Sequence, residues 1–266
     1  MNKKIIIIGF GQVGKIEYEV LYKNYLPDVL DLNYLIINSN FKTQSIDKSI
    51  EQLKNIIYDL AIVCVSTPLN NITGLLDCTK VLEAVNEVNA KMYLIKSTVN
   101  VGTCDEIAAK TGKNIVHSPE FSGTTQHCNN FDYNFTILGG DKESCNKIQQ
   151  IYQEIYDARH IYRYVDRKTA ETIKLSLNFI LASKVSLFSV IWDFCKQYNI
   201  QYEDVRQCLG LDPRINLAHT AVYDEHPYWD SHCFNKDIPA FSNAFDNKFA
   251  DSVLIYNELM KTKYKD

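Results

Sequence analysis

The chain has 266 residues with 46% hydrophobic and 23% charged side chains, which is ordinary for a globular protein of one or two domains. A net charge of -4 and the lack of a long basic run argue against a nucleic-acid partner. Eight scattered cysteines without a C-x-x-C pair predict no metal site and favour the reducing cytoplasm. We expect no membrane partner, because no run approaches the ~18 apolar residues of a membrane span.

Strands and helices alternate over the first part of the chain. Short apolar runs predict strands at 4–8, 34–37, 60–65, 92–95, 114–117, 135–138 and 160–164. Helical periodicity predicts helices at 12–25, 71–89, 101–110 and 142–157. This β-α-β alternation indicates an α/β fold, a Rossmann-type domain at residues 1–165 with a parallel, doubly wound sheet.

The pattern changes after residue 165. One long helix without Gly or Pro is predicted at 166–198, and it is apolar on more than one face, which indicates burial on several sides. A short helix at 202–209 and an amphipathic helix at about 239–260 follow, with an aperiodic segment at 216–235 between them. We therefore expect an all-helical second domain at 166–266, built on one long central helix.

A complete Gly-x-Gly-x-x-Gly fingerprint follows the first predicted strand and precedes a helix. The first glycine permits a tight turn, the second lets a pyrophosphate approach the backbone, and the third allows close helix–strand packing. The helix start then presents free N–H groups to the phosphates. The alternative is a structural glycine turn without a cofactor. The predicted dinucleotide loop consists of Gly9, Phe10, Gly11, Gln12, Val13 and Gly14.

The predicted ribose contact is unusual. An acid is expected at the end of the second strand, about 20 residues after the glycines. The strand predicted at 34–37 is instead followed by Asn38, which could still hydrogen-bond a ribose hydroxyl. Lys42 is close enough in sequence to attract the 2′-phosphate of NADP. We expect NAD as the cofactor, with NADP as the alternative.

Six further motifs occur in the order of one dehydrogenase family. They are Val63-Cys64-Val65-Ser66-Thr67-Pro68, Ser97-Thr98-Val99-x-x-Gly102-Thr103, Pro119-Glu120-Phe121, Lys174-x-x-x-Asn178, Asp212-x-Arg214-Ile215 and Cys233-Phe234-x-Lys236-Asp237. In this order the chain resembles the UDP-glucose/UDP-mannose 6-dehydrogenase family. The resemblance covers nearly all of the chain but only two of the family's three domains, so we expect a shortened form without the C-terminal UDP-binding domain.

The resemblance implies NAD-dependent oxidation of the primary, C6-type alcohol of a sugar nucleotide to a carboxylate. Cys233 would attack the intermediate aldehyde to give a thiohemiacetal, and its oxidation would give a thioester that water hydrolyses. Lys174 and Asn178 are four residues apart on a helix and share one face, where they would stabilise an oxyanion. Asp237 and Lys174 would position the water that takes the alcohol proton.

The remaining roles follow from the same resemblance. Thr98 would hold that water or the substrate, and Glu120 would be the base in thioester hydrolysis. Further cofactor contacts would be Asn38, Val65, Ser66, Thr67, Ser97, Thr98, Glu120 and Lys236. Substrate contacts would be Phe121, Ser122, Lys174, Asn178 and Arg214. The long central helix would form a homodimer, and no metal is implied.

Several positions depart from the family pattern and predict altered specificity. The loop after Phe121 reads Ser-Gly-Thr-Thr-Gln-His where the family has Leu-Arg-Glu-Gly, and Asp230 and Ser231 replace two glycines before Cys233. The enzyme could use another sugar nucleotide, or take its third domain from another chain. Two alternative functions stay open. One is a single-step β-hydroxyacid-type dehydrogenase that uses Lys174 and Asn178, and the other is a degenerate NAD-binding interaction module.

Overall fold

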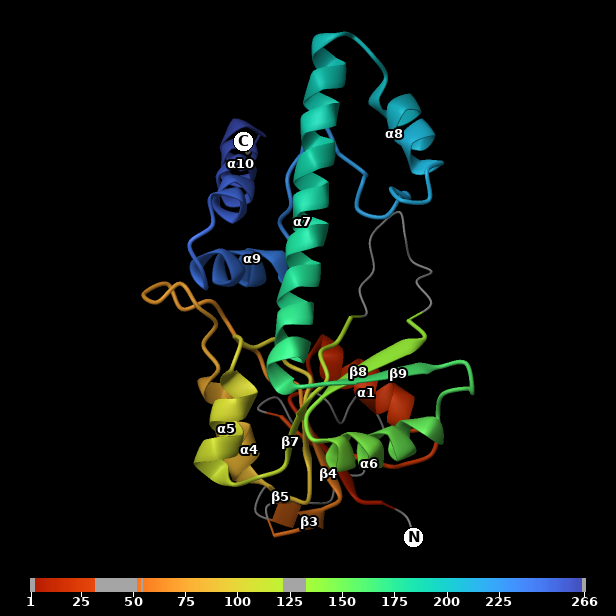
Figure 1. The fold of residues 1–266 in the computed structure, drawn as a ribbon, viewed down its shortest axis with the longest axis vertical. Coiled ribbons are helices and arrows are strands. Elements are labelled where there is room, and N and C mark those ends of the chain that lie inside the picture. The colour runs from red at the N-terminus through yellow and green to blue at the C-terminus, as the bar shows by residue number, and fades with distance from the viewer. Residues whose placement is uncertain (1–2, 32–51, 54, 122–132, 265–266) are drawn as a thin grey trace. The chain divides into compact units, whose positions relative to one another are not determined.

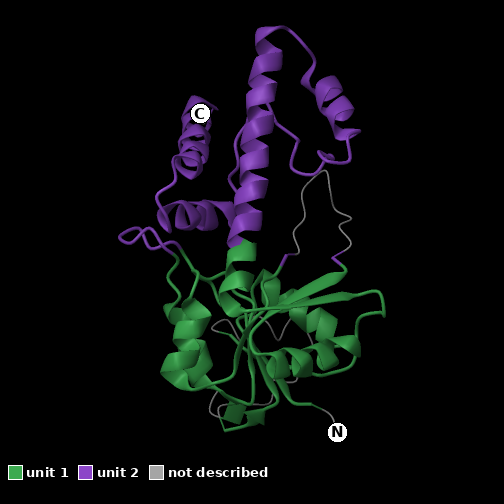
Figure 2. Cartoon of the chain, in the orientation of Figure 1, with its two compact units in different colours: residues 1–68, 76–120, 134–174 green, residues 69–75, 121–133, 175–266 purple. Residues whose placement is uncertain are grey.

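The structure is a computed structural model that describes residues 3–31, 52–53, 55–121 and 133–264. It divides into two compact units, drawn in green and purple in Figure 2. Unit 1 contains residues 1–68, 76–120 and 134–174, and unit 2 contains 69–75, 121–133 and 175–266. The division falls inside the long helix, after Lys174. A domain boundary near residue 165 stays a prediction.

Among the described residues, unit 1 contains a seven-stranded sheet in the order β2-β1-β4-β6-β7-β8-β9. The strands are β1 (Ile5–Ile8), β2 (Asp28–Leu30), β4 (Leu60–Val63), β6 (Tyr93–Ile95), β7 (Ile115–His117), β8 (Phe135–Gly139) and β9 (Ile161–Val165). All neighbouring pairs are parallel except β7 and β8, which are antiparallel. The predicted Rossmann-type fold is confirmed, but the sheet is mixed rather than purely parallel. A separate pair joins β3 (Ile57–Tyr58) and β5 (Asn89–Ala90).

Helices cover both faces of this sheet (Figure 1). In β1, Ile5 and Ile7 pack with α1 (Gln12–Leu21) and α6 (Lys142–Gln153), whereas Ile6 and Ile8 pack with α4 (Thr79–Glu87) and α5 (Thr103–Thr111). Successive strand residues point to opposite faces, so an uninterrupted isoleucine run fits a strand that is covered on both sides. This packing confirms the predicted doubly wound arrangement.

Unit 2 is helical, with α7 (Arg167–Gln197) entering it from unit 1, followed by α8 (Tyr202–Gly210), α9 (Phe234–Asn243) and α10 (Lys248–Tyr264). Ala182 of α7, Ile238 of α9 and Trp229 form one buried cluster. Trp229 lies in the aperiodic segment, and its backbone N–H and carbonyl both bond the buried Asn257 of α10. The segment without periodicity is therefore fixed by specific packing rather than by regular structure.

Three predicted elements differ from those observed. The second strand is β2, and the strand predicted at 34–37 lies outside the described residues. The helix predicted at 71–89 begins only at Thr79, because the Asn70 side chain accepts N–H bonds from Ile72 and Thr73 and holds a turn. The single final helix is two helices, because the side chain of Asn247 accepts the N–H groups of Phe249 and Ala250 and starts α10 anew.

The long helix also corrects a prediction about membranes. Within α7, an 18-residue window has a mean hydropathy of 1.6, so by length and composition this helix could cross a membrane. The expectation that no stretch is apolar enough was therefore wrong. The signal is weak, since 44% of that window is buried inside the molecule, and a core helix passes the same test.

Candidate active site

The glycine loop between β1 and α1 has the shape that a dinucleotide requires. Gly9 has φ +89°, and a Cβ there would lie 2.7 Å from the carbonyl oxygen of Cys64. A Cβ on Gly14 would lie 2.1 Å from the carbonyl oxygen of Gly9, so only glycine lets α1 approach the strand. At Gly11, leaving aside the glycine itself and its two neighbours in the chain, no described atom comes within 4 Å of such a Cβ. Gly11 precedes α1 without a side-chain cap, which leaves the first N–H groups of the helix for an anion.

The acid at the end of the second strand is present after all. Asp31 directly follows β2, about 20 residues after the glycines, and its Oδ2 accepts a 2.6 Å hydrogen bond from the N–H of Phe10. The prediction of an amide at this place relied on a strand at 34–37, whereas the observed β2 ends earlier in the chain and is followed by an acid. Asn38 lies outside the described residues, so its role stays a prediction. The spacing alone could have identified Asp31.

Two loops at the carboxyl edge of the sheet carry further predicted cofactor residues. The hydroxyl of Thr67, after β4, donates to the carbonyl oxygen of Thr98 at 2.6 Å. The hydroxyl of Ser97, after β6, donates to the carbonyl oxygen of Val65 at 2.7 Å. These bonds tie together two neighbouring loops that also include the exposed Ser66. Ligands of open α/β sheets bind at this edge.

Glu120, which follows β7, lies beside a lysine that sequence reasoning missed. The Lys96 ammonium is 3.1 Å from the Glu120 carboxylate and 2.8 Å from that of Glu17 in α1. Burial alone would lower the pKa of Lys96, but the two facing carboxylates outweigh it and raise that pKa well above its ordinary value. A lysine directly after an apolar strand was the signal available in the sequence.

The start of α7 is held on unit 1 by a buried carboxylate. Glu171 accepts the backbone N–H groups of Gly102 and Cys104 at 2.5 and 2.8 Å, and it thereby satisfies N–H groups at the start of α5. Burial raises the pKa of Glu171 despite these bonds. Lys174 lies one turn further along α7, and its charge adds to the burial that lowers the pKa of His117 to about 3.

Four predicted site residues come together in unit 2. The Asn178 amide of α7 donates to Oδ2 of Asp237 at 2.6 Å, and the Lys236 ammonium is 2.6 Å from Oδ1. Asn178 and Asp237 are buried. Cys233 is the N-cap of α9, its thiol is exposed, and its carbonyl oxygen accepts the N–H of Asp237 at 2.9 Å. The first turn of α9 therefore places the thiol and the carboxylate on one short segment.

The other predicted residues belong to other segments of the chain. Arg214 is strongly exposed and forms a 2.6 Å ion pair with Asp212. Thr98, Glu120 and Lys174 belong to unit 1, whereas Phe121 begins a unit 2 segment whose next residue, Ser122, is outside the described part of the chain. Within that part, no group of three or more His, Cys, Asp and Glu side chains could hold a metal ion.

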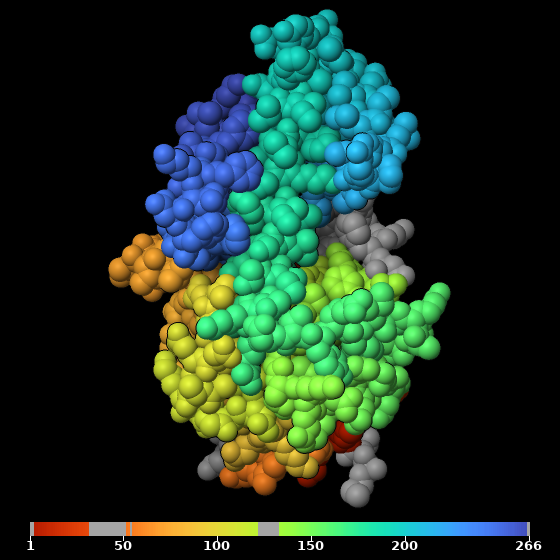
Figure 3. Space-filling model, in the orientation of Figure 1, coloured from red at the N-terminus to blue at the C-terminus, as the bar shows by residue number. Residues whose placement is uncertain are grey.

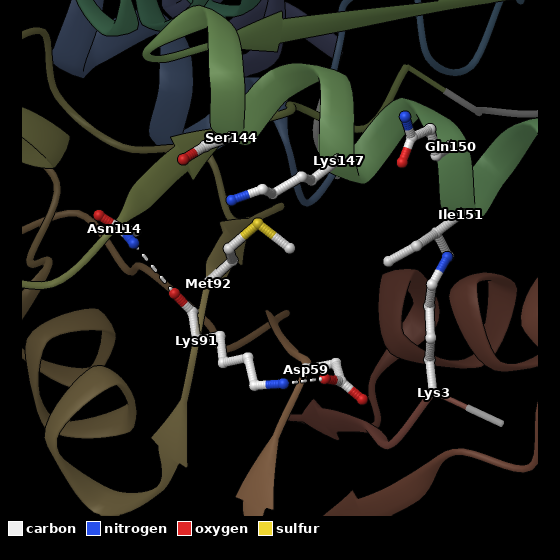
Figure 4. A pocket seen from close by; sticks show the side chains of 9 residues that line it. All are labelled: Lys3, Asp59, Lys91, Met92, Asn114, Ser144, Lys147, Gln150 and Ile151. Atoms are coloured by element: carbon white, nitrogen blue, oxygen red, sulfur yellow. Dashed lines mark hydrogen bonds and ion pairs between the residues drawn. The ribbon is translucent and has the colours of Figure 1, made fainter. Parts of the chain in front are cut away.

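A cavity of about 270 Å³ lies at the opposite edge of the sheet (Figure 4). Five of its nine lining residues lie one or two positions before a strand, and the other four come from α6. They are Lys3, Asp59, Lys91, Met92, Asn114, Ser144, Lys147, Gln150 and Ile151. The cavity contains none of the predicted site residues, and parallel sheets bind ligands at the other edge, so it is not the candidate active site.

Comparison with known families matches both halves of the chain. Residues 26–159 match the NAD binding domain of the UDP-glucose/GDP-mannose dehydrogenase family, and residues 168–259 match its central domain. The predicted family and the predicted choice of NAD are thereby confirmed. The UDP-glucose 6-dehydrogenase of Rickettsia bellii is 27% identical over 267 residues, which are 96% of this chain and 56% of that protein. The chain thus spans little more than half the length of this relative.

Solved structures agree on the fold. A UDP-glucose dehydrogenase from Pyrobaculum islandicum superposes with a TM-score of 0.81 at 19% identity, over 98% of this chain and 69% of that one. A 3-hydroxyisobutyrate dehydrogenase from Mycobacterium tuberculosis superposes with a TM-score of 0.69 at 14% identity, over 100% and 96%. At these identities the likeness concerns the fold alone, so it does not separate the two kinds of dehydrogenase.

Proposed function

Because the chain belongs to the UDP-glucose/GDP-mannose dehydrogenase family, we propose that it oxidises a primary alcohol of a sugar nucleotide to a carboxylate with NAD. The observation that carries the proposal is the buried pair of Asn178 and Asp237, which lies one helical turn from the exposed thiol of Cys233. A one-step alcohol dehydrogenase has no need of a thiol at this position. A thiol suits a reaction in which an aldehyde is held covalently for a second oxidation.

The glycine loop and Asp31 fit NAD. The open space at Gly11 and the uncapped start of α1 suit a pyrophosphate. The Asp31 carboxylate, fixed by the N–H of Phe10, would accept a hydrogen bond from a ribose hydroxyl and would repel the 2′-phosphate of NADP. When bound, NAD supplies the hydride acceptor for both oxidations.

The covalent steps follow from the position of Cys233. Its sulfur adds to the aldehyde carbon, and the resulting oxyanion takes a proton to give a thiohemiacetal. Loss of a hydride from that carbon and of a proton from its hydroxyl gives a thioester. Water then adds to the thioester carbonyl, and the C–S bond breaks to release the carboxylate and the thiol. The N-terminal end of α9 suits the negative charge that appears on sulfur and oxygen, because the helix dipole is positive there.

We assign a separate role in these steps to each of the polar residues. Asn178 and Lys236 each engage one oxygen of Asp237, so this carboxylate is held in a fixed orientation from which it can align a water. We assign Lys174 and Asn178 to stabilising the oxyanion, Thr98 to holding water or substrate, and Glu120 to taking the proton of the hydrolytic water. Arg214, Phe121 and Ser122 are proposed substrate contacts, and the altered loop at Ser122 is a proposed source of altered specificity.

We also propose a cytoplasmic homodimer formed through α7. Along this helix the exposed large apolar side chains are Ile180, Leu187, Val190 and Phe194. Their spacing follows the helical repeat, and Figure 3 shows much of α7 uncovered in unit 2 between α8 and the α9–α10 pair. A second copy is a suitable cover for such a stripe. The cysteines that the structure describes are free thiols, in keeping with a reducing compartment.

Stoichiometry tests the proposed function. The purified protein is incubated with a panel of sugar nucleotides and with NAD or NADP, and the reduced cofactor and the acid product are measured together. Two reduced cofactors per acid support the thiol route. One reduced cofactor with a ketone or aldehyde product supports a single-step dehydrogenase, and binding of NAD without turnover of any substrate supports the degenerate interaction module.

A further inference from the structure

Three charged side chains, two of them buried and one half-buried, meet in unit 1, and each comes from a different part of the chain. Glu17 lies in α1, Lys96 follows β6 and Glu120 follows β7. The ammonium of Lys96 bridges the two carboxylates, at 2.8 Å from Glu17 and 3.1 Å from Glu120. We call Glu17, Lys96 and Glu120 the Lys96 cluster. With two carboxylates for one ammonium, it carries one net negative charge.

Fold stability gives little reason for this cluster. Removing charges from water costs much of what their attraction returns, so buried ion pairs contribute little net stability. Glu17 is nevertheless fully engaged, because one carboxylate oxygen meets Lys96 and the other accepts the Tyr152 hydroxyl at 2.6 Å. A buried glutamate that is held on both oxygens serves to fix the ammonium of Lys96.

Exposure distinguishes the two carboxylates. The side chains of Glu17 and Lys96 are 3% and 8% exposed, whereas that of Glu120 is 17% exposed. Glu120 is therefore the member of the cluster that water can reach. Glu17 and Lys96 lie behind it as support, at the carboxyl edge where β6 and β7 end.

We propose that Glu17 and Lys96 form a positioning pair that holds the Glu120 carboxylate in place and ionised, so that it can take a proton from the hydrolytic water. This inference rests on the proposed role of Glu120. A single lysine facing Glu120 would hold its carboxylate but make it a weak base. Glu17 shares the ammonium and adds a like charge, so Glu120 keeps more of its affinity for a proton.

Other titratable groups face the cluster and define the conditions of a test. Burial, reinforced by Glu17, raises the pKa of the Cys64 thiol and of Tyr152 well above their ordinary values. The same two causes raise the pKa of Tyr156 to about 12, and burial lowers that of His117 to about 3. These groups are neutral near neutral pH. Among the described residues, Lys174 is a further cation that acts on His117, and it is left unchanged.

The protonation of Glu120 can be measured without turnover. Protein labelled with ¹³C at the glutamate carboxyl carbon is titrated by NMR, and the Glu120 signal is assigned as the one missing in E120Q. The substitution E17Q removes a like charge, so the Glu120 midpoint should move to lower pH. The substitution K96M removes the opposite charge, so the midpoint should move to higher pH.

A purely structural role of Glu17 and Lys96 would not move the Glu120 midpoint in opposite directions in E17Q and K96M. K91M is the matched control, since it breaks the exposed pair of Lys91 and Asp59 and should leave the midpoint in place. Displacements in the same direction, or none, overturn the positioning pair. If K96M does not fold, E17Q and the conservative E17D decide the matter, because E17Q must lower the midpoint and E17D must keep it near the wild-type pH.

Turnover then separates the two proposals. In an active enzyme, the acid limb of the pH profile for thioester hydrolysis should follow the same two displacements. Turnover with an unmoved acid limb overturns the positioning pair and leaves the proposed function intact. If the Glu120 midpoints move as predicted but no substrate is turned over, the proposed function is overturned. The pair of Glu17 and Lys96 then still controls the protonation of Glu120.

Discussion

The side-chain amide of Asn178 donates a 2.6 Å hydrogen bond to the carboxylate of Asp237, and this bond joins the middle of α7 to the first turn of α9. Both side chains are buried, so neither can exchange its partner for bulk water at low cost. The bond fixes the helix turn that carries Cys233 at its start. Substitution at Asn178 should therefore affect stability and catalysis together.

The substitution N178A should cost roughly 1–3 kcal/mol in the free energy of unfolding, because one oxygen of Asp237 loses its donor. It should also lower kcat, because the carboxylate near Cys233 is no longer held. N257A is the matched control. The side chain of Asn257 is also buried in unit 2, but it forms hydrogen bonds with the backbone of Trp229 rather than with a predicted catalytic residue. Chemical denaturation and steady-state kinetics check both. Equal losses of kcat in the two variants would show that Asn178 acts through stability alone.

The substitution C233S should abolish acid formation, because a serine hydroxyl at this position lacks the nucleophilic thiolate needed to hold the aldehyde. Acid product is measured by chromatography after prolonged incubation with NAD and substrate. C208S is the control, since Cys208 is also an exposed thiol but belongs to α8. If C233S produced as much acid as the wild type, the covalent route would be refuted.

The substitution D31N should weaken binding of NAD and reduce the preference for NAD over NADP. The loss of a charged acceptor for a ribose hydroxyl should cost about 1.5–3 kcal/mol, or roughly 10-fold to 150-fold in Kd. Removal of the negative charge also lessens repulsion of the 2′-phosphate. Calorimetric titration of both cofactors measures the effect, and D59N at the opposite edge of the sheet is the control. An unchanged ratio of the two Kd values would exclude Asp31 from the ribose site.

His117 should make the fold sensitive to acid. Burial lowers its pKa to about 3 in the folded state, whereas the unfolded chain binds the proton near 6.5. Below pH 6.5 the unfolded state therefore binds more protons, and stability falls as the pH falls towards 3. Between pH 7 and pH 5 the wild type should lose about 2 kcal/mol more than H117Q, in which this position cannot titrate. Denaturant unfolding at the two pH values measures this difference, and equal losses would contradict it.

The proposed dimer should depend on the apolar stripe of α7. L187D or F194D places a charge where a partner would bury an apolar side chain, so either variant should become monomeric in light-scattering chromatography. I72D is the control, since Ile72 is 95% exposed but lies in the segment 69–75, which is not part of α7. If L187D and F194D keep the mass of the wild type, the stripe is not the interface.

Much of the fold could be predicted because burial leaves a direct pattern in the sequence. The isoleucines of β1 must be covered on two faces, and the unbroken helical pattern of α7 appears with nearly its observed ends. Elements held by single side chains could not be predicted in this way. The separation of α9 from α10 depends on one amide, Asn247, which accepts two N–H groups.

The same limit applies to the candidate site. The residues near Cys233 could be predicted because they stand close together in one motif. Asp31 was missed because β2 is only three residues long and begins with an aspartate that is buried against the hydroxyl of Tyr58. The partnership of Glu17 with Lys96 joins residues far apart in sequence, and only the folded sheet brings them within 2.8 Å.

The proposed reaction requires a covalent bond between Cys233 and the substrate. Intact-protein and peptide mass spectrometry of samples that are quenched by acid during turnover can detect this bond. We predict an added mass equal to the acyl group of the substrate on the peptide that contains Cys233, with more of it in E120Q and none in C233S. Acid production by the wild type, with no adduct on Cys233 at any quench time in either the wild type or E120Q, would contradict the claim.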